Sequence, residues 1–332
     1  MKNSYSIFLL VVIFSYCSNT STNPSDQDDI IRTLYGHQSG ISRIAFTPNG
    51  NILVSGSYDN IIKLWNTKTL ELLKNIELNQ KPINSLAISR DGSKIISSHN
   101  NGVLKIWDIN SGELIDTIIT RNKYGWVSNH YLEFNPLGNK LASVGDGDDI
   151  NLFDANSWTF IKTFRGHTFS IYSIAFTNNG DKIASCSQDG TIKLWDVNAG
   201  TLIRSMDGYS RDIYSVKITP DDSNIVSGCR DSTIKLWDLN TGNLINTLIG
   251  HHASVNSVAI SKDGKSIVSG SSDRTVKLWD LKTGKLIKTY NGHTGSIVSV
   301  DISPDGNYIA SASRDSTIKI WKGPNYSSLK GN

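Results

Sequence analysis

The chain alternates apolar and polar residues in short runs, and this period of two is typical of β-strands. Residues 171–176 show the alternation clearly, and residues 180–195 contain two β-rich runs joined by an Asp-Gly turn. No helical period accompanies these runs. The sequence therefore predicts an all-β fold made of short antiparallel strands.

The strand pattern repeats along the chain at a nearly constant spacing. Successive tryptophans are equally spaced over most of the chain, and Phe153 takes the tryptophan position in the third repeat. The step from Trp107 to Phe153 is longer than the others, so four residues are inserted there. Seven repeats of this kind, each supplying four short strands, can stack around an axis. The six tryptophans at the repeated position are Trp65, Trp107, Trp195, Trp237, Trp279 and Trp321.

Gly-His and Trp-Asp pairs frame most of the repeats. With these motifs at a period of about 40–45 residues, the chain resembles the WD-repeat family, that of the G-protein β-subunit, over residues 28–322. The resemblance implies a seven-bladed β-propeller of four-stranded antiparallel blades, followed by a C-terminal tail over residues 323–332. The histidines of the Gly-His pairs are His37, His167, His251 and His293.

The two ends of the propeller are expected to meet in one blade. The chain after Trp321 lacks the strand that follows Trp279, whereas the sequence that leads to His37 matches that strand. Without an outer strand, the last blade would leave backbone N–H and C=O groups unpaired. We therefore expect residues 29–35 to pair with the last blade and close the ring.

Four repeats contain His, Ser, Asp and Trp at matching offsets. The first three residue types also form hydrolase triads, but a catalytic set needs to be built only once, whereas this one recurs with a tryptophan in every copy. We interpret it as structural: the indole N–H donates to the serine, the serine to one His nitrogen, and the other His N–H to the Asp. In the family this tetrad ties the inner strands of a blade to the loop before them. The tetrads are His37, Ser55, Asp59, Trp65; His167, Ser185, Asp189, Trp195; His251, Ser269, Asp273, Trp279; and His293, Ser311, Asp315, Trp321.

The remaining repeats depart from the tetrad. Asn79 stands in the histidine position of the second repeat and Tyr209 in that of the fifth. The third repeat has Gly147 and Phe153 in the Asp and Trp positions. Because each blade packs mainly on its neighbours, we predict that blades two and three are the softest part of the ring.

In this family the usual docking surface is the narrow face that carries the Gly-His loops, called the top face below. It is lined by the second residue of each inner strand and by the residue before the tetrad Asp. Aromatic residues and arginines, which dominate binding hot spots, are frequent at these positions, although tyrosine is also common on β-rich surfaces. The resulting candidates for a protein or peptide partner are Tyr58, His130, Tyr172, Gln188, Tyr214, Arg230, Asn256 and Arg314.

Residues 1–17 differ from the rest of the chain. Lys2 precedes an apolar run over residues 7–14, and a polar linker over residues 18–27 follows. The run is short for a membrane span and reads as a secretory signal. It also resembles a bacterial lipoprotein signal, in which Cys17 would be lipidated, although Tyr16 stands where a small residue is usual. Lipidation, plain cleavage and an uncleaved anchor all remain open, and any membrane contact is expected through this segment alone.

Several classes of site are not indicated. The net charge of +3 is spread evenly, which argues against nucleic acid as the principal ligand. The acidic run at residues 146–149 lacks the later Glu of a calcium loop, so we expect no metal, and no motif calls for a cofactor. Cys186 and Cys229 are expected to be buried and unpaired. Trp126, in the loop with the insertion, either covers blade three or anchors a partner, and Trp158 stands in a turn-glycine position.

These observations favour an exported, non-catalytic, monomeric scaffold that binds a protein or peptide on its top face. It would be a membrane-anchored lipoprotein or a periplasmic or secreted protein. Two alternatives remain. An enzyme or a small-ligand-binding propeller would need a polar cluster, present only once, in the central channel, and the sequence indicates none. A cytoplasmic WD-repeat adaptor would keep its N-terminal segment uncleaved.

Overall fold

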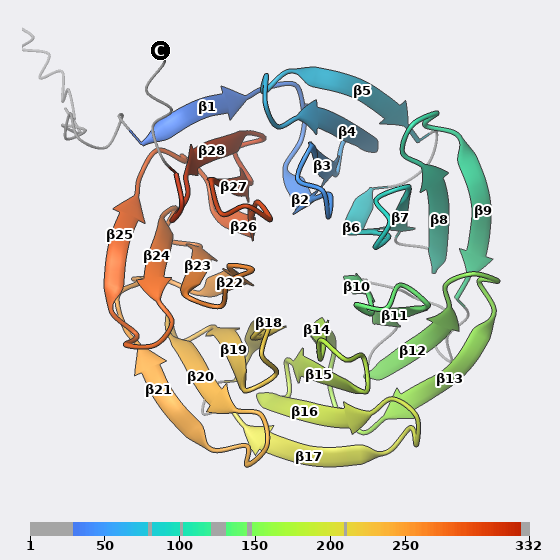
Figure 1. Ribbon diagram of the computed structural model, residues 1–332, viewed down its shortest axis with the longest axis vertical. Coiled ribbons are helices and arrows are strands. Elements are labelled where there is room, and N and C mark those ends of the chain that lie inside the picture. The colour runs from blue at the N-terminus through green and yellow to red at the C-terminus, as the bar shows by residue number, and fades with distance from the viewer. Residues whose placement is uncertain are drawn as a thin grey trace, which may run out of the picture.

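The computed structural model describes residues 29–78, 82–99, 102–120, 131–144, 148–208 and 211–326. Seven four-stranded antiparallel sheets form the blades of a ring (Figure 1). In six sheets the strand that comes first in the chain is innermost and the strand that comes last is at the rim, whereas the seventh sheet has β26 innermost and β1 at the rim. The predicted seven-bladed propeller is thereby confirmed. Within the described residues, no helix is long and apolar enough to span a membrane.

The strands are four to six residues long and follow the chain around the ring. In blades one to three they are β2 (Ile41–Phe46), β3 (Ile52–Ser57), β4 (Ile61–Asn66), β5 (Leu72–Glu77); β6 (Ile83–Ile88), β7 (Lys94–His99), β8 (Val103–Asp108), β9 (Leu114–Ile119); β10 (Tyr131–Phe134), β11 (Lys140–Val144), β12 (Asp149–Asp154) and β13 (Phe160–Arg165).

The later blades repeat the same order. In blades four to six the strands are β14 (Ile171–Phe176), β15 (Lys182–Ser187), β16 (Thr191–Asp196), β17 (Leu202–Asp207); β18 (Ile213–Ile218), β19 (Asn224–Cys229), β20 (Ile234–Asp238), β21 (Leu244–Leu248); β22 (Val255–Ile260), β23 (Ser266–Ser271), β24 (Val276–Asp280) and β25 (Leu286–Tyr290).

The last blade is shared between the two ends of the chain. It contains β26 (Ile297–Ile302), β27 (Tyr308–Ser313), β28 (Ile318–Lys322) and, as its outer strand, β1 (Ile30–Leu34). Strand β1 runs antiparallel to β28, with Ile30 opposite Trp321 and Leu34 opposite Ile318. The predicted closure is confirmed, and the otherwise open edge of β28 is paired.

Apolar side chains fill the spaces between neighbouring blades. One cluster joins Phe164 of blade three to Ile174 and Trp195 of blade four, and a corresponding cluster joins Leu53 of blade one to Ile318 of blade seven. Burying such side chains stabilises the fold by roughly 1.5–3 kcal/mol each. Because each cluster draws on two blades, a blade that lost its neighbour would expose part of its core.

The inner strand of six blades carries a β-bulge at its second residue. In blade one, Ile41 pairs with Ser57 and Arg43 with Gly56, so Ser42 between them has no partner in the ladder. The same irregularity recurs in blades two, four, five, six and seven. A bulge re-aims a side chain and often lies next to a binding site. The bulged residues are Ser42, Asn84, Tyr172, Tyr214, Asn256 and Val298.

Candidate functional site: the mouth of the central channel

The four complete tetrads define the top face. In blade four, the His167 ring lies 2.7 Å from both Ser185 Oγ and Asp189 Oδ2, and the Trp195 indole N–H donates to Ser185 Oγ at 2.8 Å. The same three bonds recur in blades one, six and seven with nearly identical lengths. Each histidine thus ties the loop that enters a blade to the turn between its second and third strands. These loops and turns surround the mouth of the channel.

The tetrad carboxylates are stabilised in their charged form. Burial alone would raise the pKa of Asp189, but the hydrogen bonds from His167, the Thr191 hydroxyl and the Thr168 backbone N–H lower it. The pKa values of Asp59, Asp273 and Asp315 are lowered against burial in the same way. Desolvation lowers the pKa of His37 more than Asp59 raises it. The tetrads are therefore saturated hydrogen-bond networks at neutral pH.

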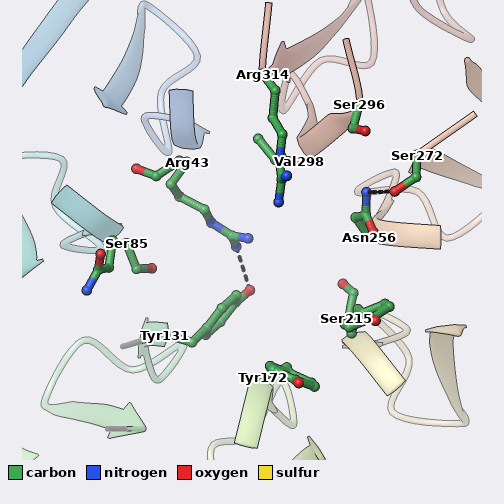
Figure 2. Close-up of a pocket in the computed structure, with 13 residues that line it drawn as sticks. Arg43, Ser85, Tyr131, Tyr172, Ser215, Asn256, Ser272, Ser296, Val298 and Arg314 are labelled. Carbon is green, nitrogen blue, oxygen red and sulfur yellow. Dashed lines mark hydrogen bonds between the residues drawn. The ribbon is translucent and has the colours of Figure 1, made fainter. Parts of the chain in front are cut away.

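A chamber of about 350 Å³ occupies the mouth of the channel. All seven inner strands contribute to it, six of them through the bulged second residue. One of these residues, Ser42, also donates to the Gly56 carbonyl. Figure 2 shows the lining side chains converging on one hollow. Its lining residues are Ser42, Arg43, Asn84, Ser85, Tyr131, Tyr172, Tyr214, Ser215, Asn256, Ser272, Ser296, Val298 and Arg314.

One wall of the chamber is aromatic. The rings of Tyr172 and Tyr214, on adjacent inner strands, are 5.2 Å apart between centroids and tilted by 49°. Burial, with the nearby Asp212 carboxylate, raises the pKa of both hydroxyls. Asp212 is held by Arg230, whose Nη1 lies 2.6 Å from its Oδ2. This wall offers two partly exposed phenol groups that remain neutral proton donors.

The structure distributes the predicted partner residues over two zones. Tyr172, Tyr214, Asn256 and Arg314 line the chamber. Tyr58, Gln188 and Arg230 are exposed on the surrounding rim, where Tyr58 and Arg314 flank Gly40. His130 lies outside the described residues, as do Cys17, Trp126, Asn79, Gly147 and Tyr209. That these positions bind a partner stays a prediction.

Below this chamber lies a polar cluster that is present only once in the described part of the ring. Arg43 Nη2 donates to Tyr131 Oη at 2.5 Å, and Lys217 Nζ lies 2.7 Å from Glu133 Oε2. The Asp301 carboxylate accepts the Phe46 N–H at 2.8 Å. The expectation of a channel without such a cluster is wrong. Its residues stand at the third and fifth positions of the inner strands, whereas the candidate docking residues of these strands stand at the second position.

The missed residues had a detectable signal. The third position of the inner strand is Ser in five blades, but Arg43 in blade one and Tyr131 in blade three. The fifth position is Ala in four blades and Glu133, Lys217 or Asp301 in the others. A comparison of repeats at each position would have identified all five residues as exceptions. Where a bulge is present, the second and third residues of the inner strand can both face the channel, as Ser42 and Arg43 do.

Most members of the cluster form hydrogen bonds or an ion pair with one another. Burial alone would lower the pKa of Lys217, but the charge of Glu133 raises it above the usual range for lysine. Burial raises the pKa of Asp301 even though its carboxylate accepts the backbone N–H groups of Phe46 and Ile302. Among the described residues, no three His, Cys, Asp or Glu side chains gather as a metal site would require. The arrangement links opposite sides of the channel through hydrogen bonds and an ion pair.

Trp158 packs against Phe134 through its side chain. Its φ of 57° is in the left-handed region that glycines adopt at the matching turns, such as Gly200 at 76°. Its ring meets Phe134 edge to face, with centroids 6.4 Å apart. The two residues join the cluster between blades two and three. This contact offsets the backbone strain, which costs about 1–3 kcal/mol for such a residue.

Comparison with known proteins agrees with this architecture. The family model for the WD domain, G-beta repeat, matches residues 28–66, 70–108, 158–196, 200–238, 242–280 and 284–322. These segments cover well over half of the chain. They leave out the third repeat, in which Gly147 and Phe153 replace the usual residues. The structure nevertheless builds a blade from that repeat.

Curated relatives match over short stretches. The nuclear distribution protein nudF of Aspergillus oryzae is 37% identical over 62 residues, which is 18% of this chain and 14% of that protein. Ribosome assembly protein 4 of Saccharomyces cerevisiae is 43% identical over 44 residues (13% of this chain, 8% of that protein). Eukaryotic translation initiation factor 3 subunit I of Aspergillus niger is 48% identical over 42 residues (13% and 12%).

The matches thus span no more than about one seventh of these relatives. They correspond to one or two repeats, whereas the family model covers most of the ring. Repeat motifs, tetrads, blade number and family match all agree. The chain belongs to the WD-repeat family and folds as a seven-bladed β-propeller.

Proposed function

We propose that this propeller is a non-catalytic scaffold that binds a protein or peptide at the mouth of its channel. The observation that carries the proposal is the chamber, in which paired tyrosines and an exposed arginine surround a hollow of about 350 Å³. Tyrosine and arginine dominate binding hot spots because they combine a large contact area with directed hydrogen bonds. The relatives named above are, by their names, a nuclear distribution protein, a ribosome assembly protein and a subunit of a translation initiation factor, and these names support binding rather than catalysis.

The polar cluster below the chamber is the one feature that favours an enzyme or a small-ligand channel. Its members have partners of their own: Lys217 with Glu133, Arg43 with Tyr131, and Asp301 with two backbone N–H groups. A residue that is to accept or donate a proton in catalysis has to reach a substrate. We therefore assign the cluster a bracing role across the channel.

The binding proposal is tested by affinity capture with the full chain. Tyr172→Ala combined with Tyr214→Ala removes the aromatic wall, and each hot-spot tyrosine contributes roughly 2 kcal/mol or more. Leu202→Ala with Ile203→Ala is the control, because these side chains are exposed on the outer strand β17. We expect the tyrosine pair to lose the captured partner and the control to retain it, with both variants folded by circular dichroism. Capture unchanged by the tyrosine pair would contradict the proposal.

We propose further that residues 1–17 export the chain and that Cys17 is its lipid anchor. Strand β1 begins beside Lys322, at the face opposite the tetrads, since Lys322 N–H donates to the Asp29 carbonyl at 3.2 Å. A tether over residues 18–27 would then hold the bottom face toward the membrane and leave the top face free. Mass spectrometry of the mature protein tests this, and the expected N-terminus is a lipidated Cys17. A chain that still begins at Met1 would contradict lipidation of Cys17 and leave the uncleaved anchor and the cytoplasmic adaptor as the alternatives.

The proposed unit is a single propeller. Its last blade is completed by the N-terminal strand of the same chain, so that blade needs no strand from a second copy. Light scattering on the purified chain is expected to give the mass of one copy. A stable dimer would overturn this part of the proposal.

A further inference from the structure

The charged side chains that line the chamber are all positive. Two arginines, Arg43 and Arg314, are among its lining residues, whereas no Asp or Glu of the described segments is. The other polar lining groups are serine, asparagine and tyrosine side chains. A hollow with cationic walls and neutral hydrogen-bond donors attracts an anion. This bias is independent of the aromatic wall on which the proposed function rests.

Arg43 forms the floor of the chamber and retains unused donors. Its guanidinium stacks on the Tyr131 ring, 4.3 Å from the centroid, and donates to the Tyr131 hydroxyl (Figure 2). Its Nε is buried and has no hydrogen-bond partner. A guanidinium carries five N–H donors, and a buried donor without a partner costs about 1–3 kcal/mol. Since the Tyr131 hydroxyl accepts from Arg43, its own proton is available to a ligand oxygen.

Arg314 belongs to blade seven, next to blade one, and its side chain lies beside Arg43 in the same hollow (Figure 2). It follows β27 and is exposed, and no carboxylate within the described residues forms an ion pair with it. Arg230 differs, because its charge is compensated by Asp212. Of the two arginines among the predicted partner residues, Arg314 is therefore the one with an uncompensated charge directed at the chamber.

The acidic residues deeper in the channel do not cancel this charge. Glu133 is bound to Lys217, and Asp301 accepts the backbone N–H groups of Phe46 and Ile302. Both line the compartment below Arg43, a space of about 200 Å³, rather than the chamber above it. Two cations, Arg43 and Lys217, balance these two carboxylates, so Arg314 gives the site its excess positive charge.

We propose that the chamber binds the carboxylate of an acidic side chain, presented by a peptide segment of the partner protein, between Arg43 and Arg314. The chamber is near the lower end of the range of about 300–1,000 Å³ for small-ligand pockets, so it suits one side chain and not a folded element. Guanidinium groups bind carboxylates through short, charge-assisted hydrogen bonds. Tyr172 and Tyr214 would then contact the neighbouring residues of the peptide. This inference rests on the proposed function and specifies what the top face recognises.

The test uses the full chain on an array of random dodecapeptides, each printed in two versions. One version contains Glu or Asp, and its twin contains the matching amide, Gln or Asn. We expect bound peptides to favour the acidic version roughly tenfold or more, as the loss of one charge-assisted bond implies. Arg314→Gln should remove that preference and Arg314→Lys should retain part of it. Arg32→Gln, an exposed arginine on the outer strand β1, is the control and should leave it unchanged.

The outcomes separate this inference from the proposed function. If bound peptides are lost in the Tyr172→Ala, Tyr214→Ala variant but acidic and amide twins bind equally, the carboxylate site is wrong and the binding face stands. An acidic preference that survives Arg314→Gln also overturns the site. If binding does not depend on the tyrosine pair, or if no peptide binds, the proposed function fails and the carboxylate site fails with it.

Discussion

In blades one, four, six and seven, a histidine from the preceding loop forms a hydrogen bond with a buried serine. In blade two, this hydrogen bond comes from a histidine of the same strand as the serine. In blade two, His99 Nε2 lies 3.0 Å from Ser97 Oγ, and the Trp107 indole donates to the same oxygen at 2.8 Å. His99 stands two residues after the serine, where the complete blades have Ser57, Ser187, Ser271 and Ser313. The serine and tryptophan thus keep their bond although the loop histidine is missing.

Blade five gives a third solution. Ser227 Oγ accepts from Trp237 at 3.0 Å and lies 3.7 Å from the Cys229 sulfur, in the same position as His99. Its Asp231 pairs with Lys235 at 2.8 Å instead of with a histidine. The comparison teaches that the Trp–Ser bond is kept in all six blades that have a tryptophan at this position. The histidine that ties the loop to the blade is the variable part.

The largest expected effect is from removing the loop histidine of a complete blade. His167→Ala leaves the buried Ser185 and the Asp189 carboxylate without their ring partner, so we expect the free energy of unfolding to fall by about 3 kcal/mol. His99→Ala breaks the hydrogen bond to the Ser97 hydroxyl and should cost about 1–2 kcal/mol. Urea denaturation measures both. Equal losses would contradict the distinction between the two kinds of blade.

The tetrad carboxylates make the ring sensitive to acid. Because the folded-state pKa values of Asp59, Asp189, Asp273 and Asp315 are lowered from 3.8, their stabilisation is present above that pH and is lost as the pH falls below it. The lowered pKa of His37 has the same sign and acts from about pH 6.5 downward. Asp301 has a raised pKa and therefore contributes with the opposite sign. It is one group, whereas the four tetrad carboxylates and His37 all lower the stability as the pH falls.

Denaturation curves between pH 7 and pH 3 test this pH dependence. We expect the free energy of unfolding to decrease slightly below pH 6.5 and steeply below pH 4. A profile that is flat down to pH 3 would show that the tetrads do not stabilise the folded state through their charge.

A smaller effect is expected from the low local stability that the sequence predicts for blades two and three. In blade three, Phe153 has no N–H to donate to Ser143, and the inner strand β10 has four residues instead of six. We expect backbone amides in β10 and β11 to exchange hydrogen roughly tenfold faster than those in β22 and β23 of blade six. Hydrogen exchange read by mass spectrometry measures this. Uniform protection around the ring would show that packing between blades outweighs the tetrads.

The smallest expected effect is that of Cys229→Ser. The cysteine is buried and unpaired, as predicted for both Cys186 and Cys229, and four other blades have serine in its position. We therefore expect the free energy of unfolding to change by less than about 1 kcal/mol. A loss above about 2 kcal/mol would mean that the sulfur fills a space that a hydroxyl cannot.

Features that recur from blade to blade could be predicted from the sequence, whereas contacts that occur only once could not. The regular spacing of the tryptophans identified the blades and the tetrad positions, and the match between residues 30–37 and residues 286–293 identified the N-terminal closure, because each of these patterns occurs more than once in the chain. His99 and the cluster of Arg43, Tyr131 and Lys217 have no such copies. The contacts of the cluster depend on bulges and on which blades face one another across the channel, and neither follows from alternation along a single strand. Alternation does place His99 and Ser97 on one face of their strand, but it does not show that the His99 ring replaces the loop histidine.

Site-specific cross-linking tests the central claim, that the mouth of the channel is the partner-binding surface. A benzoylphenylalanine replaces Tyr214 in one variant and Leu202, on the outer strand β17, in a second, and both are irradiated in cells that express the full chain. The account predicts a covalent adduct with a partner protein from position 214 and none from position 202. Adducts from position 202 alone, or equal adducts from both, would contradict it.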